Sequence, residues 1–216
     1  MGNSGDLTTI YIVRHGETEG NSSGIITGHF DSPLSQEGEN QADLRREDLG
    51  QIHFDAVFSS DLIRAKRTAE ILTLERQLAL NTLRILRERN FGDWEGRLTS
   101  EVVKENQHLF ERLSTLSETA KREFKFNPGY ESEQEIYQRF ITFLREMAVS
   151  YLGKTVLVVN HGSMMRSLLM HLGWADYDTL PPGSIENTGY IVLESDGVDF
   201  FIKETKGVNK KVIQRE

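Results

Sequence analysis

Two short apolar runs most constrain what this 216-residue chain can fold into. Residues 10–13 and 156–159 are continuous, rich in β-branched side chains and flanked by polar residues. Such runs are typical of strands that are buried on both faces of a parallel sheet. One residue beyond each run stands a His-Gly pair, which begins at His15 in the first case and at His161 in the second. If both strands are central and parallel, both imidazoles emerge at the same edge of the sheet.

Three further segments predict strands. Residues 56–58 form another short apolar run of the buried kind. Residues 190–193 and 200–202 flank an Asp-Gly pair at Asp196, and this dipeptide favours a tight hairpin at a sheet edge. We therefore expect a mixed sheet in which most strands are parallel.

Helical periodicity is clearest over residues 131–152, where apolar side chains recur every three or four positions. Shorter helices are predicted over residues 33–49, 61–74, 98–116 and 163–172. Ser60 or Asp61 is the expected N-cap of the second of these. The alternation predicts one α/β domain over residues 1–216, a three-layer sandwich with helices on both faces of a mostly parallel sheet. Ligands bind beyond the carboxyl ends of the strands in such sheets.

Composition excludes several classes of function. The 25 Lys and Arg residues stand against 33 Asp and Glu, which gives a formal net charge of −8 and argues against a nucleic-acid or anionic-lipid partner. Cysteine is absent, so a cysteine nucleophile and thiolate metal sites are excluded. No apolar run approaches the roughly 20 residues of a membrane span, and the first residues lack the pattern of a signal peptide. We expect a cytoplasmic protein.

Basic side chains accompany the two histidines. Arg14 directly precedes His15, and Arg64 lies in the first turns of the helix that follows the 56–58 strand. A lone His or a helical Arg more often has a structural or solvated role. Their gathering at one sheet edge instead indicates a site, in which the guanidinium groups of Arg14 and Arg64 could clamp a phosphate from two sides. The other histidines lack this context and are expected on the surface or in the core: His29, His53, His108 and His171.

Four blocks of residues follow one another along the chain. They are residues 14–18 with Asn21, Thr27-Gly28, Leu34-Ser35 and Gly38 downstream, then residues 59–70, 86–96 and 160–162. Together these blocks resemble the signature of the histidine phosphatase superfamily, which has the phosphoglycerate mutase-like fold. The resemblance covers roughly residues 8–195. A lone Arg-His-Gly is a weak motif, whereas four ordered blocks that end in a second His-Gly are a strong one.

The resemblance implies a covalent phosphohistidine mechanism. His15, unprotonated on its attacking nitrogen, would displace the alcohol from phosphorus, and water would then attack the phosphohistidine. Glu88 matches the family position that protonates the leaving alcohol. On the residues alone, an exposed ion pair with the flanking Arg87 or Arg89 would be the commoner role for this carboxylate.

Charge on the transferring phosphoryl group needs stabilisation, and Arg14, Arg64 and His161 are expected to supply it, His161 as a cation or an N–H donor. Neutral groups are expected to complete the phosphate and substrate contacts: Asn21, Thr27, Gly28 and Gly162. No metal or other cofactor is implied, because three basic side chains perform the charge neutralisation that a metal would bring. The spacing of the histidines fits no zinc signature.

The segment 97–130 is predicted to be a substrate lid and bears on the choice between hydrolase and mutase. In the family's mutases a longer lid carries an Arg-Arg pair that holds the substrate carboxylate and second phosphate, and this interval is short and has no such pair. Most of its basic residues are expected to be solvated. Lys121-Arg122 is the one cluster that could reach a second anionic group.

Residues 128–132, followed by Arg139, resemble the Gly-Glu-Ser/Thr segment of the superfamily's small phosphatases, such as the fructose-2,6-bisphosphatase-like and α-ribazole-phosphate phosphatase branches. Two departures bear on the shape of the pocket: Tyr130 stands where those relatives often have Gly, and Gly20 where many members have an aromatic residue. Ile25 replaces a basic residue common in the mutases, which weakens the mutase reading.

We therefore favour a phosphoric monoester hydrolase that acts on a small phosphorylated metabolite. One alternative is a 2,3-bisphosphoglycerate-dependent phosphoglycerate mutase, and another is a non-catalytic module that binds a phospho-ligand or partner. Intact His15 and Glu88 count against the binding module. Residues 203–216 are expected to be a solvated tail. The substrate and the oligomeric state stay open, with a homodimer as one option.

Overall fold

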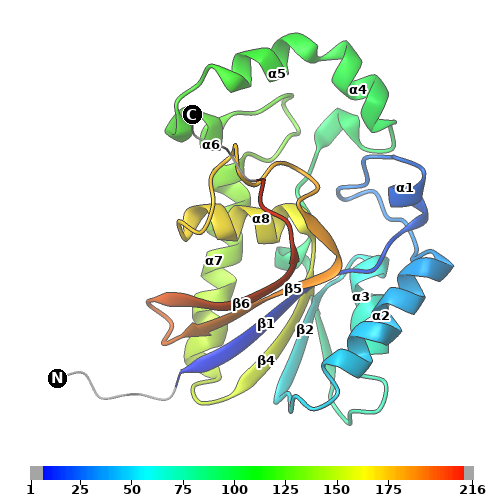
Figure 1. The fold of residues 1–216 in the computed structure, drawn as a ribbon, viewed down its shortest axis with the longest axis vertical. Helices are drawn as coiled ribbons and strands as arrows, with labels where there is room; N and C mark the ends of the chain where they lie inside the picture. Colours follow the sequence, from blue (N-terminus) through cyan, green and yellow to red (C-terminus); the bar gives the residue numbers. More distant parts are fainter. Residues whose placement is uncertain (1–6, 212–216) are drawn as a thin grey trace.

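A six-stranded sheet runs through the computed structural model, which describes residues 7–211 (Figure 1). Its strands are β1 (Thr8–Arg14), β2 (Ala56–Ser60), β3 (Leu80–Leu83), β4 (Thr155–Asn160), β5 (Ile185–Ser195) and β6 (Phe200–Val208). The order across the sheet is β3-β2-β4-β1-β5-β6. The first four of these are parallel to one another, whereas β5 and β6 are antiparallel to their neighbours. The predicted mixed, mostly parallel sheet is confirmed.

The register of β1 and β4 places the two His-Gly pairs side by side. Val13 lies opposite Val159 and Arg14 opposite Asn160 in this parallel pair. The His15 amide then donates to the Asn160 carbonyl at 3.0 Å. Both imidazoles therefore leave the sheet at neighbouring points of its carboxyl edge, as the two apolar runs predict.

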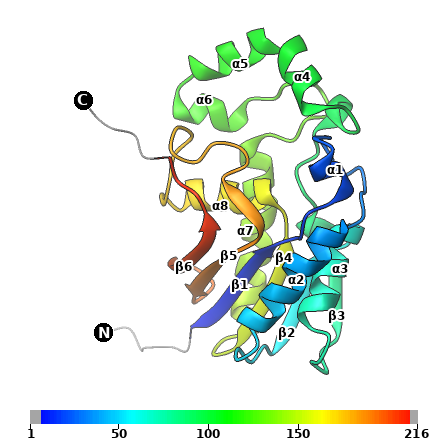
Figure 2. The same ribbon diagram turned by 45° about the vertical axis from the view of Figure 1, so that its right-hand side comes forward.

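Helices cover both faces of the sheet (Figures 1 and 2). Their bounds are α1 Glu19–Ser22, α2 Gln36–Asp48, α3 Ile63–Leu72, α4 Thr99–Glu105, α5 Gln107–Ser114, α6 Glu118–Glu123, α7 Glu133–Ser150 and α8 Gly162–His171, with 3₁₀ turns η1 Arg84–Leu86 and η2 Gly92–Trp94. Helices α7 and α8 pack together on one face, and α2 and α3 on the other. The three-layer sandwich is confirmed.

The strands divide their side chains between two cores because successive residues of a strand point to opposite faces. Ile10 and Ile12 join the larger core under α7 and α8. Val13 joins the smaller core under α2 and α3. All three side chains are fully buried. The apolar runs are continuous because both faces of these strands are covered.

The helix starts follow from capping, with one correction. Helix α7 begins at a capping box in which the Ser132 hydroxyl accepts from the Glu135 amide and the Glu135 carboxylate accepts from the Ser132 amide. For α3 the predicted cap at Ser60 or Asp61 is wrong, because the N-cap is Leu62 and no side chain in the described part of the chain caps the helix. The Asp61 carboxylate instead accepts two bonds from Arg87, both at 2.7 Å.

The segment 97–130 departs from the single predicted helix over 98–116. It breaks at Asn106 into α4 and α5, and the side-chain amide of Asn106 donates to the Val102 carbonyl at 2.9 Å. Helix α6 follows and was not predicted. The three helices lie beyond the carboxyl edge of the sheet, in green in Figure 2, above α8 and beside α1. This is the place that a cover over the site would occupy.

The strands near the end of the chain are longer than predicted. The hairpin at Asp196 is confirmed, and its carboxylate accepts the amides of Val198 and Asp199 at 2.8 Å each. Strand β6 continues to Val208, so the predicted tail at 203–216 is wrong in its first half because those residues pair with β5. Residues 212–216 lie outside the described part.

Strand β3 was not predicted, because its four residues are half-buried or exposed and lack an apolar run.

Within residues 7–211, no helix is long and apolar enough to cross a bilayer.

Candidate active site

His15 and His161 meet at the carboxyl edge of β1 and β4. Their ring centroids lie 5.1 Å apart, with the rings inclined at 62°. His15 Nδ1 lies 2.7 Å from the Gly16 carbonyl oxygen. A carbonyl can only accept, so Nδ1 carries the proton and Nε2 keeps its lone pair. The tautomer that a nucleophilic imidazole needs is therefore set by the backbone.

Burial and neighbouring cations keep both imidazoles neutral. Burial lowers the pKa of His15 well below its usual 6.5, and the Arg64 and Arg14 guanidinium groups lower it further. The pKa of His161 is lowered for the same reasons, with burial first and Arg64 next. Of the two expected forms of His161, the neutral N–H donor is the one this environment favours. Both of its ring nitrogens are buried and have no hydrogen-bond partner among residues 7–211.

Arg64 is fully buried. Its guanidinium donates to the Gly28 carbonyl at 2.6 Å and lies 3.5 Å from the Asp31 carboxylate. Gly28 has φ +54°, and a Cβ there would lie 2.2 Å from the Glu95 carboxylate, so this turn requires glycine. Gly28 thus contributes a carbonyl that holds Arg64 in place. The sequence predicted that Gly28 contacts the phosphate. The contact that the structure shows is with Arg64, whose guanidinium donates to the Gly28 carbonyl.

Arg14 extends from the end of β1 along the start of α8. It donates to the Ile185 carbonyl, while its Nε is buried and unpaired within the described chain. A Cβ at Gly162 would lie 3.3 Å from this Nε, which is tighter than ordinary packing. The glycine after His161 therefore allows Arg14 to pass close to the backbone.

Glu88 lines the same cavity as His15 and is 8% exposed. Its two carboxylate oxygens accept the backbone amides of Arg89, at 2.7 Å, and Ser163, at 3.1 Å. The exposed ion pair with its neighbours, which the residues alone favoured, is wrong. Arg87 binds Asp61, and Arg89 binds Glu133. Both flanking cations are taken, and the Glu88 carboxyl group forms no salt bridge with any residue of 7–211.

Sequence reasoning missed residues that fix the backbone of the site. The Asn187 side chain and the Thr188 amide both donate to the His15 carbonyl, at 3.1 and 3.3 Å. Thr188 has φ +55°, the one positive φ outside glycine within residues 7–211. The His29 ring contacts the Glu88 carbonyl oxygen at 2.9 Å, beyond the surface or core role expected of it. No periodicity or motif marks these residues, because they act on backbone far away in sequence.

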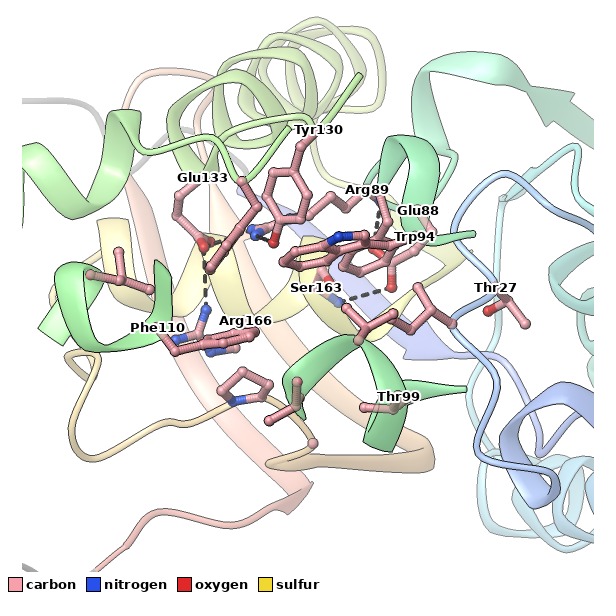
Figure 3. Close-up of a pocket in the computed structure, with 18 of the residues that line it drawn as sticks. Thr27, Glu88, Arg89, Trp94, Thr99, Phe110, Tyr130, Glu133, Ser163 and Arg166 are labelled. Atoms are coloured by element: carbon pink, nitrogen blue, oxygen red, sulfur yellow. Dashed lines mark hydrogen bonds and ion pairs between the residues drawn. The ribbon is translucent and has the colours of Figure 1, made fainter. Parts of the chain in front are cut away.

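A cavity of about 620 Å³ opens between this edge and the segment 97–130 (Figure 3). Five of the predicted site residues line it: Arg14, His15, Asn21, Thr27 and Glu88. Gly162 lines a smaller adjoining cavity of about 170 Å³. Arg64, His161 and Gly28 are not among the residues that line either of these two cavities. Of the two residues in the predicted Lys121-Arg122 cluster, Lys121 lines the larger cavity and Arg122 does not.

No group of three His, Asp or Glu side chains within residues 7–211 is arranged to hold a metal ion.

Comparison with known proteins places the chain in a family. The model of the histidine phosphatase superfamily (branch 1) matches residues 10–206. Phosphoserine phosphatase 1 of Hydrogenobacter thermophilus is 32% identical, over 87% of this chain and 86% of that protein. The adenosylcobalamin/alpha-ribazole phosphatase of Escherichia coli is 32% identical, over 76% of this chain and 78% of that protein.

A solved structure gives the same placement. The phosphoglycerate mutase from Bacillus anthracis superposes with a TM-score of 0.82 at 25% identity, covering 94% of each chain. The region matched by the family model contains both His-Gly pairs, the Arg64 helix and Glu88. This chain belongs to the histidine phosphatase superfamily, branch 1, as its four ordered blocks indicate.

Proposed function

We propose that this protein is a phosphoric monoester hydrolase that acts on a small phosphorylated metabolite through a phosphohistidine on His15. The observation that carries the proposal is the state of His15: it is neutral, it donates from Nδ1 to Gly16, and it lines the cavity with Nε2 unprotonated. The similarity to two phosphatases supports the same reaction.

In the first step His15 Nε2 attacks phosphorus while the bond from phosphorus to the ester oxygen breaks. The electron pair of that bond goes to the leaving alcohol, which takes a proton from the Glu88 carboxylic acid. In the second step water attacks the phosphohistidine and gives a proton to the Glu88 carboxylate. The bond from phosphorus to nitrogen then breaks, its electron pair returns to Nε2, and both groups regain their starting forms.

Positive charge for the phosphoryl oxygens comes from Arg14 and Arg64, and His161 adds an N–H donor. The unpaired Nε atoms of both arginines and the one N–H group of neutral His161 are available as donors within the described chain. Asn21, Thr27 and the backbone at Gly162 complete the phosphate contacts. Burial strengthens these interactions because the surrounding dielectric is low.

The mutase is the second candidate, because a solved mutase shares the fold. Phosphoryl transfer back to a phosphoglycerate needs cations around the substrate carboxylate and second phosphate. The segment 97–130 places one basic side chain, Lys121, on the cavity and otherwise lines it with apolar or neutral groups. The segment 97–130 therefore lacks the basic cluster that would hold both anionic groups of a phosphoglycerate, and this favours the hydrolase.

Several expectations stay predictions: the cytoplasmic location, action without metal or cofactor, a covering role for residues 97–130, and a homodimer.

The test is an assay in chelator of a panel that includes phosphoserine, phosphoglycerate, a sugar phosphate and a nucleoside monophosphate, beside a coupled mutase assay. We expect phosphate release from at least one ester at a rate unaffected by the chelator. Mutase flux well above phosphate release would replace the hydrolase with the mutase. If protein shown to be folded is inactive in both assays, the remaining candidate is the non-catalytic binding module.

A further inference from the structure

A second group of charges is buried on the side of the cavity where Figure 3 shows Arg166 and Glu133, away from Thr27. Arg89 and Arg166 both bind the same oxygen of Glu133, at 2.7 and 3.2 Å. All three side chains are at least 90% buried. Two guanidinium groups thus share one carboxylate, and one positive charge is left without a partner inside the cluster. A buried charge of this kind is costly unless an anion balances it.

Tyr177 stands next to this cluster with an unused donor. The Arg166 guanidinium lies 5.2 Å from the centre of its ring, and Lys121 Nζ lies 5.5 Å from it. Burial and the Glu133 carboxylate raise the pKa of the Tyr177 phenol, so it keeps its proton. The hydroxyl is buried, yet it has no hydrogen-bond partner within residues 7–211. Asp178, the remaining carboxylate on this wall, is exposed to solvent.

Both cavities connect these groups to the reacting end. The smaller one is lined by Arg14 and Glu88 as well as by Arg89 and Arg166, and the larger one by His15 as well as by Arg166 and Tyr177. Figure 3 shows Glu88 and Thr27 toward one side, Arg166 and Glu133 toward the other, and Trp94 between them. A single molecule can therefore reach from His15 to Arg166.

The wall between the two ends is aromatic. Trp94, Phe110, Phe126 and Tyr130 line it and pack on one another, with ring centroids 4.7 to 5.9 Å apart. A volume of about 620 Å³ falls in the range of pockets that enclose drug-sized ligands. A three-carbon leaving group would leave most of this space and its apolar wall without contact.

We propose that this end of the cavity is an anion subsite for the leaving group of the substrate. The subsite consists of Arg166, Tyr177 and Lys121, with Arg89 and Glu133 holding Arg166 in place. It selects phosphomonoesters whose alcohol part has a ring-bearing apolar body and, at its far end, a carboxylate or another anionic oxygen group. The inference deepens the proposed function and rests on it, because both use one cavity.

The test compares two substrates that differ only at the far end: the phosphate monoester of 3-(4-hydroxyphenyl)propanoate and that of the corresponding neutral amide. Their phenolic leaving groups are alike, so the ratio of kcat/KM values reports the far end alone. We expect the wild-type protein to favour the carboxylate by about tenfold or more, the effect of a hydrogen bond to a charged group. Equal kcat/KM values would overturn the subsite while leaving the hydrolase intact.

Two variants locate the preference. Tyr177→Phe removes only the unpaired hydroxyl, and Arg166→Gln removes the charge; each should bring the ratio toward one. Damage to the reacting end lowers kcat/KM for both substrates and leaves their ratio unchanged. A purely structural effect can therefore be distinguished from loss of the subsite. Tyr137→Phe, on α7 and outside the cavity, is the matched control and should keep the wild-type ratio. A wild-type ratio retained in both Tyr177→Phe and Arg166→Gln would contradict the assignment.

Calorimetry separates failure of the subsite from failure of the proposed function. The free carboxylate 3-(4-hydroxyphenyl)propanoate should bind the wild-type protein more tightly than it binds Tyr177→Phe, by several-fold, whether or not turnover occurs. Removing an unpaired buried hydroxyl should not lower the Tm. Absence of turnover with this binding difference would reject the hydrolase and keep the anion site. Equal binding by both proteins would reject the anion site.

Discussion

The two ends of the cavity are charged in different ways. At the reacting end, Arg14, Arg64 and His161 keep buried polar atoms without partners in the described chain, and His15 is neutral. At the far end, two arginines are joined through Glu133 and face an aromatic wall. The first end suits a doubly charged phosphoryl group of any monoester. The second end discriminates between leaving groups, and the chemistry of the reaction does not depend on it.

The difference also follows the fold. The histidines of the reacting end stand at the ends of parallel strands whose register is fixed by a core on both faces. The far end gathers side chains from the η1–η2 loop, α6, α7, α8 and the loop after α8. Its geometry depends on tertiary contacts between residues distant in sequence, so we expect it to vary more readily than the reacting end.

The largest effect should come from the reacting end. His15→Ala removes the nucleophile and should lower kcat by at least about 10³-fold on every ester, because the covalent intermediate forms on this side chain. Steady-state phosphate release measures this loss. His53→Ala, on the surface of the protein, is the matched control and should retain wild-type kcat. Comparable losses in both variants would break the assignment of His15.

Arg64→Met should reduce kcat/KM by about 10²- to 10³-fold, since it removes a preorganised charge from the phosphoryl group. It should also raise the pKa of His15 and His161, because the Arg64 cation lowers both. His15 would then be protonated at a higher pH, and the acidic limb of the kcat/KM profile should move upward in pH. Arg67→Met, exposed on the same helix, should show neither change. A slower enzyme with an unmoved profile would contradict the electrostatic coupling.

Glu88→Gln tests the proton donor. Alkyl esters should lose about 10²-fold in kcat, whereas aryl esters should lose much less because a phenolate leaves without full protonation. The measurement is the ratio of kcat on a matched alkyl and aryl pair in the two proteins. Equal losses on both esters would show that Glu88 acts by some means other than proton transfer.

The aromatic wall should have a smaller effect. Trp94→Leu should raise the KM of ring-bearing monoesters several-fold more than that of glycerol phosphate, because the smaller side chain loses stacking area. Trp174→Leu is the control, since Trp174 lies outside both cavities. Equal changes in KM for small and ring-bearing esters would mean that the wall does not contact the leaving group. The far end would then not differ from the reacting end in selecting the leaving group.

The smallest effect is on stability. Both histidines have a folded-state pKa below the ordinary 6.5, so the unfolded chain binds more protons as the pH falls through that value. The free energy of unfolding should be at its full value above pH 6.5 and decline below it, by up to about 1.4 kcal/mol per pH unit for each group. Urea unfolding at pH 7.5 and 5.5 measures the decline. Replacing His161 by Gln should reduce it, and an unchanged decline would argue against the buried neutral imidazole.

The sequence predicted the reacting end well for a physical reason. Strands buried on both faces leave a continuous apolar run, and the residues directly after such a run lie at the carboxyl edge of the sheet whatever the rest of the chain does. His15 and His161 are predictable in this way, and Arg64 is predictable from the helix that begins shortly after the 56–58 run. Their arrangement required only that the strands be parallel, which the alternation with helices indicated.

The remainder depends on partners that no local pattern reveals. The cap of α3 was mispredicted because Arg87, 26 positions away, takes the Asp61 carboxylate. Asn187 and Thr188 act on the His15 backbone across more than 170 residues. At the far end, Glu133 looks like an ordinary residue of a first helical turn, and only the structure shows that two arginines converge on it. Charge pairing of this kind is a property of the folded chain.

The central claim is that the phosphoryl group passes through His15, and trapping that intermediate tests the claim most directly. The wild-type protein is mixed with a ³²P-labelled monoester, quenched within milliseconds in alkali and mapped by mass spectrometry. The account predicts an alkali-stable, acid-labile label on the peptide that contains His15, formed at least as fast as kcat and absent from His15→Ala. Label on another residue, or burst-free turnover with no labelled protein at any time, would contradict it.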